Sequence, residues 1–393
     1  MFSEVIYYLF LAVVALGYRF VGQSWRSVFL ATAGMAFYTF YAKEAIFLLV
    51  GLTVLSWFLL FPPDAVKKAV KWHDKPAVHN TALVIVISLA VLGFFKYSGF
   101  IAESFGVVNH SFPAAPLAIS FFVFEFVHVA AEKRKGTITS IGFADYFSFI
   151  FFFPTMVAGP IKRYDQFSEY THAPKVGSKD VLEGSFRIIL GLLKKAVLAD
   201  NINSVLLEIG SPDKTSSPLM LSAAVVLYGF RIWLDFSGYS DVAIGSARLF
   251  GIKVPENFLQ PYLQRNIALF WRHWHVSLSS WLTQYVYIPL GGSRKGLPRQ
   301  LVNLMIVMLV SGIWHGAAWN FVVWGAWHGV LLCSQKLWEL KVVPKLPEKL
   351  VQSWASRATS YVLTMICVWF GWMLFMWPMP SCIKYLQIML GGL

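Results

Sequence analysis

Charge and cysteine are both scarce in this sequence. Charged residues make up 13% of its 393 residues, whereas soluble globular domains carry about a quarter. The three cysteines, Cys333, Cys367 and Cys382, form no CxxC or other metal-ligand spacing, so a disulfide framework is not expected. Long linkers, low-complexity stretches and internal repeats are also absent, and we expect a single domain over residues 1–393.

Hydrophobic residues are abundant instead. They form 57% of the chain, aromatic residues form 17%, and the mean hydropathy is +0.60. A chain of this size and composition would expose large apolar patches in water, so we expect it to fold in a lipid bilayer. The net charge of +13 lies mainly in short stretches between apolar runs. That distribution is typical of membrane topology and does not favour nucleic-acid binding.

The apolar runs predict an all-α polytopic membrane protein. A helix needs about 20 apolar residues to cross the hydrocarbon, and we expect about eleven spanning helices with one or two partial or re-entrant ones. The candidate spans are residues 4–20, 27–42, 44–62, 80–98, 114–131, 143–160, 181–207, 217–238, 262–290, 300–316, 318–338 and 356–378. The runs 27–42 and 300–316 are short enough to be tilted, re-entrant or buried.

Lysine and arginine in the first loops predict an orientation. Loops 19–26, 62–79 and 133–138 are basic, whereas the alternate loops hold only Lys43, and 101–113 holds neither residue type. By the positive-inside rule, the N-terminus lies outside and the basic loops face the cytoplasm. The first apolar run has no basic stretch before it, so a cleavable signal peptide is not expected.

Two histidines are the leading candidates for chemistry. His315 ends an apolar run and is followed by small residues, which allow a substrate or another backbone to come close. An imidazole can take a proton from an attacking hydroxyl; the alternative is a helix-packing histidine. His275 follows His273 by two positions, about 200° around a helix, so the two cannot face one site. Beside them, Trp314 adjoins His315, and Arg272 can snorkel or bind an anion.

Acidic residues within apolar runs are the next candidates. Asp235 and Asp241 flank Gly238 and two serines, which predict a break in the helix that lines a polar vestibule. Capping of that break by the two aspartates is the alternative. Glu125 and His128 are three positions apart, so they share a helix face and can bond each other. A buried acid with a histidine indicates a functional site, although a structural pair between helices is equally compatible.

Several other features do not favour further sites. His328 resembles His315 in its setting, but we interpret it as structural, and nothing near Cys333 activates its thiol. No HExxH motif is present, so no metal site is predicted. The glycine-rich stretch 289–296 lacks a preceding strand and a GKS/T sequence, and we interpret it as a basic loop that attracts an anionic carrier or coenzyme.

Four stretches together resemble one known family. They are IWLDFSGYSDVAIGSARLFGIKVPENF, FWRHWHVSLSSWL, YIPLGGSRKG and SGIWHGAAWNFVVWGAWHG, with PLAISFFVFEFVHVAAEKRKG and FFFPTMVAGPIKRY upstream. They resemble the membrane-bound O-acyltransferase (MBOAT) family, in particular the bacterial envelope branch that contains alginate O-acetyltransferases and the D-alanyl transfer proteins of teichoic acids. The resemblance covers about residues 116–371.

The resemblance implies a ring of tilted helices around a central tunnel. It implies that His315 is the central catalytic residue and His275 the second one, and that Glu125, Asp235, Tyr239 and Asp241 lie near the core. An acyl thioester, either acetyl-coenzyme A or an acyl carrier protein, would enter from the cytoplasm, and the acceptor hydroxyl from outside. No tightly bound cofactor is implied.

The resemblance also implies partners and a place in the cell. The acyl group, acetyl or D-alanyl, would pass through the bacterial inner membrane to an SGNH-type transferase or a membrane-tethered acceptor, and then to an exopolysaccharide such as alginate or to another envelope polymer. A transporter of envelope precursors would predict repeats in two halves, which are not visible. A noncatalytic scaffold would predict that His315→Ala has no effect.

Overall fold

The computed structural model describes residues 4–64, 77–107, 112–171 and 176–391. Over these residues the chain is helical throughout and contains no strand, as the apolar pattern predicts. The basic residues of loop 62–79 that support the predicted orientation, Lys67, Lys68, Lys71 and Lys75, lie outside this part of the chain. The chain divides into two compact units, residues 1–191 with 239–255 and residues 192–238 with 256–393.

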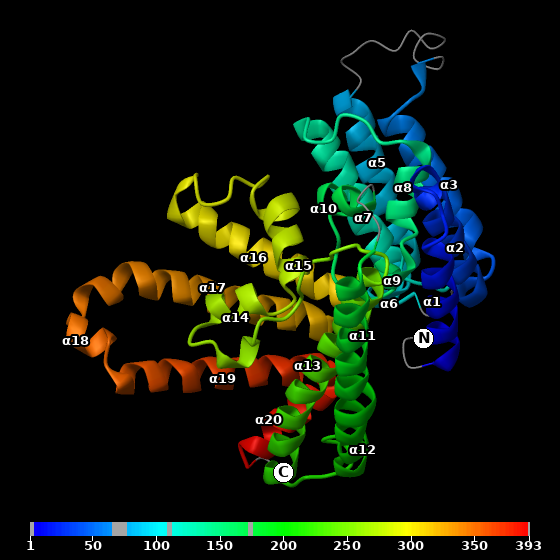
Figure 1. Ribbon diagram of the computed structural model, residues 1–393. Helices are drawn as coiled ribbons and strands as arrows, with labels where there is room; N and C mark the ends of the chain where they lie inside the picture. The colour runs from blue at the N-terminus through cyan, green and yellow to red at the C-terminus, as the bar shows by residue number, and fades with distance from the viewer. Residues whose placement is uncertain (1–3, 65–76, 108–111, 172–175, 392–393) are drawn as a thin grey trace. The chain divides into compact units, whose positions relative to one another are not determined.

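The first unit is built from the N-terminal helices (Figure 1). Helix α2 packs against α3 and α8, and α5 packs against α3 and α7. The bounds are α1 Val5–Tyr18, α2 Arg26–Ala42, α3 Ala45–Leu60, α5 Ala77–Leu92, α6 Ser98–Ser104, α7 Ile119–Lys135, α8 Phe143–Ile150, α9 Phe153–Met156, α10 Tyr164–Thr171 and α11 Ser178–Leu192, with a 3-10 turn Gln23–Trp25 and a π-helical segment Gly93–Tyr97.

The second unit contains the C-terminal helices. Helix α16 packs along α17, and α17 runs beside α19, to which α18 connects it (Figure 1). The bounds are α12 Asp200–Ile209, α13 Pro218–Arg248, α14 Ile267–His273, α15 Val276–Leu282, α16 Gly296–His315, α17 Trp319–Lys341, α18 Glu348–Val351, α19 Trp354–Met376 and α20 Met379–Met389. π-Helical segments cover Leu193–Ala199 and Thr283–Tyr287, and 3-10 turns cover Pro261–Leu263 and Val343–Lys345. Residues 239–248 of α13 belong to the first unit.

Local capping explains several helix ends. Helix α7 ends at Gly136, whose φ of 82° is the left-handed conformation that terminates helices, and three basic residues occupy its last turn. The Ser353 side chain caps α19 by accepting a hydrogen bond from the Ser356 amide at 3.1 Å. These ends agree with the predicted ends of the apolar runs to within a few residues.

Four helices among the described residues are long and apolar enough to cross a membrane: His79–Ser104, Pro218–Arg248, Gly296–His315 and Trp354–Met376. The helix Gly296–His315 has 20 residues, so it is longer than the predicted short run 300–316 and extends over about 30 Å. The larger number of spans stays a prediction.

Three predicted helices differ from the observed ones. The break predicted at Gly238 is wrong, because α13 continues for 31 residues; there Ser237 directs its hydroxyl to the Leu234 carbonyl of its own helix. The run 143–160 is interrupted between α8 and α9, where Pro154, in the first turn of α9, has no amide hydrogen with which to continue a helical ladder from α8. The run 262–290 is likewise broken, at Trp274 and His275.

Candidate active site

His275 lies at the break between α14 and α15. Its φ of 44° and ψ of 55° place it in the left-handed region, which is uncommon for a residue other than glycine. The side chain is 1% exposed, and neither ring nitrogen has a hydrogen-bond partner among the described residues. The Phe236 ring lies edge-on to the imidazole at 4.6 Å between centroids. A buried polar ring without a protein partner is unusual, and it is suited to receiving a polar group of a reactant.

The environment of His273 differs from that of His275. The Nδ1 atom of His273 lies 2.7 Å from the Leu269 carbonyl oxygen of its own helix. The continuous helix predicted through both histidines is wrong, because α14 ends at His273. The two imidazoles are nevertheless in different surroundings, because the chain changes direction between them.

His315 is the last residue of α16 and lies among aromatic rings. Its imidazole is 4.7 Å from the Trp314 ring, 5.2 Å from Trp324 and 5.1 Å from Phe375, all in edge-on arrangements. Trp314 also contacts His275, with 6.0 Å between ring centroids. Both histidines that the sequence singles out therefore contact the same indole.

Glycines hold α16 tightly against α17. A β-carbon on Gly312 would lie 2.3 Å from the Phe321 carbonyl oxygen, and one on Gly325 would lie 2.5 Å from the Met308 carbonyl oxygen. Gly329 follows Gly325 by four residues, and a β-carbon there would lie 2.6 Å from the Met305 sulfur. Small residues at this spacing allow helix backbones to approach closely in membranes. The close packing fixes the C-terminal end of α16, where His315 lies.

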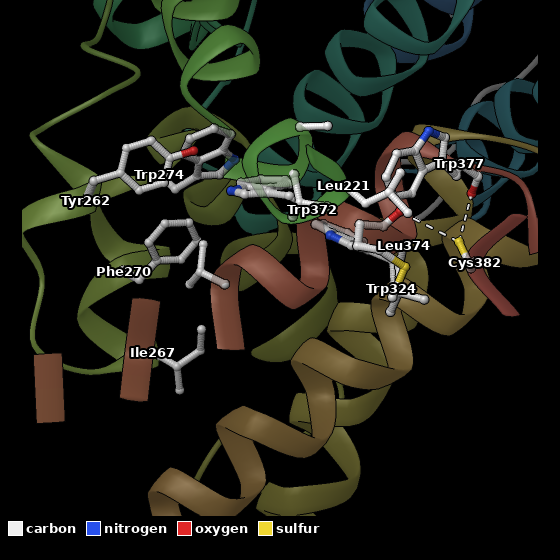
Figure 2. Packing of buried hydrophobic residues seen from close by; sticks show 14 of the residues in the cluster. Leu221, Tyr262, Ile267, Phe270, Trp274, Trp324, Trp372, Leu374, Trp377 and Cys382 are labelled. Carbon is white, nitrogen blue, oxygen red and sulfur yellow. Dashed lines mark hydrogen bonds between the residues drawn. The ribbon is translucent and has the colours of Figure 1, made fainter. Parts of the chain in front are cut away.

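His328 is packed into the aromatic core of the second unit. Its Nδ1 accepts a hydrogen bond of 3.3 Å from the Trp271 indole, and its ring contacts Trp324 at 5.0 Å. Gly371 leaves room for it, because a β-carbon there would lie 2.5 Å from Nε2. Figure 2 shows part of this aromatic core, in which Trp274 lies near Tyr262 and Phe270, and Trp324 lies beside Trp372. These contacts agree with the structural interpretation of His328.

A cavity of about 670 Å³ opens in the second unit, with sequence neighbours of His275 and His315 in its wall. Its wall includes Trp271, Val276, which follows His275, and Ser311, which is one helical turn before His315. Arg272 contributes a positive charge to the wall, a position in which it can bind an anion. The other polar lining residues are Asn266, Ser279, Ser280, Thr283, Gln284, Tyr287, Gln300, Gln335, Lys336 and Glu339. The cavity suits a ligand with both polar and apolar parts.

Asp235 is the remaining predicted residue of the second unit. Its Oδ1 lies 3.0 Å from Lys195 Nζ, and the same ammonium lies 2.5 Å from Asp200 Oδ1. Because α13 is unbroken here, Asp235 does not cap a helix break. It forms an ion-pair network between α13 and the π-helical segment 193–199.

Glu125 and His128 lie in the first unit, and both bond to residues just before or at the start of α10. Glu125 forms an ion pair with Lys162, and the His128 Nε2 accepts a hydrogen bond of 2.9 Å from the Tyr164 amide. Burial lowers the pKa of the Lys162 ammonium, and the Glu125 carboxylate opposes that shift. The sequence identified the polar pair but not Lys162, which lies 37 positions from Glu125.

Asp241 and Tyr239 also belong to the first unit. Asp241 accepts a hydrogen bond of 2.5 Å from the Arg187 guanidinium, so it joins α13 to α11 and does not cap a break. Gly184 and Gly245 let these two helices approach, because a β-carbon on Gly184 would lie 2.8 Å from the Gly245 carbonyl oxygen. Tyr239 is half-buried in α13.

Of the aromatic residues around His315, the sequence singles out Trp314 but not Trp324 or Phe375. Trp324 and Phe375 lie in apolar runs with no polar neighbour to mark them, and 16 tryptophans and 34 phenylalanines give many equivalent candidates. Their positions in the site depend on the packing of α17 and α19, which no local motif specifies.

Long apolar helices and buried polar residues among them define a helical membrane protein. The chain matches the membrane-bound O-acyltransferase family over residues 68–377. A probable alginate O-acetylase AlgI of Pseudomonas putida is 33% identical over 388 residues, 95% of this chain and 76% of the relative. A peptidoglycan O-acetyltransferase of Helicobacter pylori is 32% identical, covering 84% of this chain and 69% of the relative. A teichoic acid D-alanyltransferase of Streptococcus thermophilus is 34% identical over 236 residues, 56% of this chain and 57% of the relative.

The chain therefore belongs to the membrane-bound O-acyltransferase family, as its motifs predicted. It is a membrane O-acyltransferase. The similarity to O-acetyl-transferring relatives extends over more of the chain than the similarity to the D-alanyl-transferring one, which favours O-acetyl transfer.

Proposed function

We propose that this protein transfers acetyl from a cytoplasmic thioester to a hydroxyl presented at the outer face of the bacterial inner membrane. The observation that carries the proposal is that His275 and His315 both contact the Trp314 indole. Residues near each of them in the sequence line a cavity of about 670 Å³. The names of the relatives support an envelope polysaccharide, such as alginate, as the final acceptor. D-alanyl transfer from a carrier protein is the second candidate, supported by the teichoic acid relatives.

In this proposal His315 acts as the base. It takes the proton of the acceptor hydroxyl while the hydroxyl oxygen attacks the thioester carbonyl carbon. The carbon–sulfur bond breaks, the ester forms, and the proton passes to the departing thiolate, so no external oxidant or metal is needed. His275 assists by binding the polar group that its unpartnered ring nitrogens face. Surrounding rings keep water away from the thioester.

The cavity is the proposed binding site of the donor's phosphopantetheine arm. This arm is common to coenzyme A and acyl carrier proteins, and it combines amides, a hydroxyl and a phosphate with short apolar segments. Arg272 and Lys336 supply positive charge for the phosphate, and the glutamine and serine side chains of the wall supply hydrogen bonds. In this proposal the thioester binds transiently as a co-substrate, and the reaction needs no tightly bound cofactor.

The arrangement of the helices in the membrane is part of the same proposal. We infer a ring of about eleven spanning helices around a tunnel, with the N-terminus outside, following the family resemblance and the basic loops. The acetyl group would be passed to an SGNH-type transferase or a membrane-tethered acceptor outside the cell. The same fold without catalysis, as a scaffold, would leave the two histidines without a role.

The test uses the purified protein in liposomes with labelled acetyl-coenzyme A, a labelled D-alanyl carrier protein, and a serine- or tyrosine-bearing model acceptor. We expect label transfer from acetyl-coenzyme A, lost in His315→Ala and reduced about 100- to 10,000-fold in His275→Ala. Both variants should insert and fold as the wild type does. Transfer from the D-alanyl carrier alone would select the second candidate, and full activity of His315→Ala would refute the proposed chemistry.

A further inference from the structure

One short segment is hydrogen-bonded to the chain on both sides of His275. The Leu259 amide donates to the His273 carbonyl oxygen at 3.0 Å, and the Val276 amide donates to the Asn257 carbonyl oxygen at 2.9 Å. These bonds attach the residues before and after His275 to the same stretch, Asn257–Leu259. The backbone of His275 is therefore held at both ends.

The Asn257 side chain strengthens this attachment. Its Oδ1 accepts a hydrogen bond of 2.9 Å from the Ser277 hydroxyl and one of 3.4 Å from the Ser277 amide. Asn257 is fully buried. Because both its main-chain and side-chain oxygens bind the first turn of α15, Asn257 fixes where that helix begins, directly after His275.

Aromatic contacts complete the support of His275. The Phe258 ring lies 5.1 Å from Trp274 and 5.2 Å from Phe236, and Phe236 lies edge-on against the His275 imidazole. The segment that bonds the backbone around His275 thus also packs against the ring that contacts its side chain.

The conformation of His275 requires such support. A left-handed conformation is disfavoured for residues with a β-carbon, and it persists only where the surrounding structure determines it. Released from Asn257, His275 would relax toward the right-handed or extended regions, and its imidazole would turn away from Trp314.

We propose that Asn257 is a positioning residue of the acyl transfer reaction. It holds His275 in the left-handed conformation and so directs the imidazole, with both nitrogens unbonded by the described protein, to the reacting groups. This inference rests on the proposed role of His275. It gives the buried Asn257–Ser277 pair a role in catalysis in addition to one in stability.

The test compares four variants with the wild type. Asn257→Leu removes the acceptor oxygen with little change in volume, Asn257→Asp keeps an acceptor oxygen, and Ser277→Ala removes the hydroxyl donor. The matched control is Asn320→Leu, which removes another buried amide of the second unit, one that donates to the Leu374 carbonyl oxygen at 3.2 Å. Steady-state transfer from acetyl-coenzyme A gives kcat and KM for each protein.

A second readout does not depend on turnover. Diethyl pyrocarbonate modifies unprotonated imidazoles. Peptide mass spectrometry measures the rate of this modification at His275 relative to the rate at the buried His328 of the same molecule. Local release of His275 raises this ratio, whereas general loosening of the unit raises both rates together. His328 thus serves as an internal control for stability.

We expect Asn257→Leu to lower kcat about tenfold or more with little change in KM, and to raise the His275-to-His328 modification ratio by a similar factor. Ser277→Ala should show a smaller effect in the same direction, and Asn257→Asp should restore most of kcat. Asn320→Leu should lower the unfolding temperature and leave kcat and the ratio unchanged.

An unchanged ratio in Asn257→Leu, or equal acceleration at both histidines, would overturn the inference. Retained transfer in His275→Ala would instead refute the proposed role of His275, while the modification ratio would still report whether Asn257 holds the residue. The two failures are therefore distinguishable.

Discussion

The packing of α16 against α17 leads to a quantitative prediction for Gly312→Ala. The added β-carbon would lie 2.3 Å from the Phe321 carbonyl oxygen and 3.1 Å from the Gly325 α-carbon. Both are backbone atoms, so no side-chain rotation can relieve the overlap. The two helices must separate, and His315, three residues further along α16, must move with them.

The expected change in the stability of Gly312→Ala is the sum of two opposing contributions. Replacing glycine by alanine inside a helix stabilises it by about 0.5–1 kcal/mol when there is space for the methyl group. Overpacking in a close-packed interior costs about 1–3 kcal/mol. Gly51 in α3 provides the matched control, since a β-carbon there has no atom within 4 Å. We expect Gly51→Ala to unfold at or above the wild-type temperature and Gly312→Ala to be less stable than this control by about 1–3 kcal/mol.

Thermal unfolding in detergent micelles and acetyl transfer in liposomes measure the two consequences. A loss of this size lowers the unfolding temperature by several degrees, and displacement of His315 lowers kcat more than it changes KM. If Gly312→Ala matched Gly51→Ala in both measurements, the helices would not be in the close contact described, and the argument that they position His315 would fail.

Two further predictions follow from buried contacts. Glu125→Leu or Lys162→Met alone leaves one charge buried without its partner, which costs about 3–5 kcal/mol; the double variant should recover most of that stability in a double-mutant cycle of unfolding, and strictly additive losses would contradict the ion pair. Trp271 lines the cavity and contacts Trp324, which packs on His315. Trp271→Leu should therefore raise kcat/KM for butyryl-coenzyme A relative to acetyl-coenzyme A by about tenfold or more, and an unchanged ratio would show that this indole does not limit acyl length.

The sequence predicts most helices well where an apolar run has clear polar ends. The predicted spans 44–62 and 356–378 correspond to α3, Ala45–Leu60, and α19, Trp354–Met376. Hydrophobicity and charge are local properties, so they can be read directly from neighbouring residues. The chemistry of His315 is suggested in the same way, by the small residues that follow it.

Contacts between distant residues account for the errors. Gly238 with its serines predicts a break, yet α13 tolerates them because a single glycine costs only about 1 kcal/mol in a helix. Glu125 and His128 satisfy the spacing for a mutual bond, yet both bond to the stretch Lys162–Tyr164. For Glu125 and His128 the sequence identifies the unusual residues but not Lys162 and Tyr164, because the tertiary fold supplies those partners.

The break at His275, at the centre of the proposed site, is a further feature that local sequence does not predict because distant residues determine it. The run FWRHWHVSLSSWL contains no glycine or proline, so its pattern predicts a continuous helix. In apolar surroundings a helix break is tolerated only where other protein groups satisfy the freed backbone, and here Asn257 and Leu259 supply those bonds. A continuous helix would keep the His273 carbonyl and the Val276 amide in its own ladder and would need no such segment. The Asn257–Leu259 segment therefore accounts both for the failure of the local prediction and for the position of the histidine.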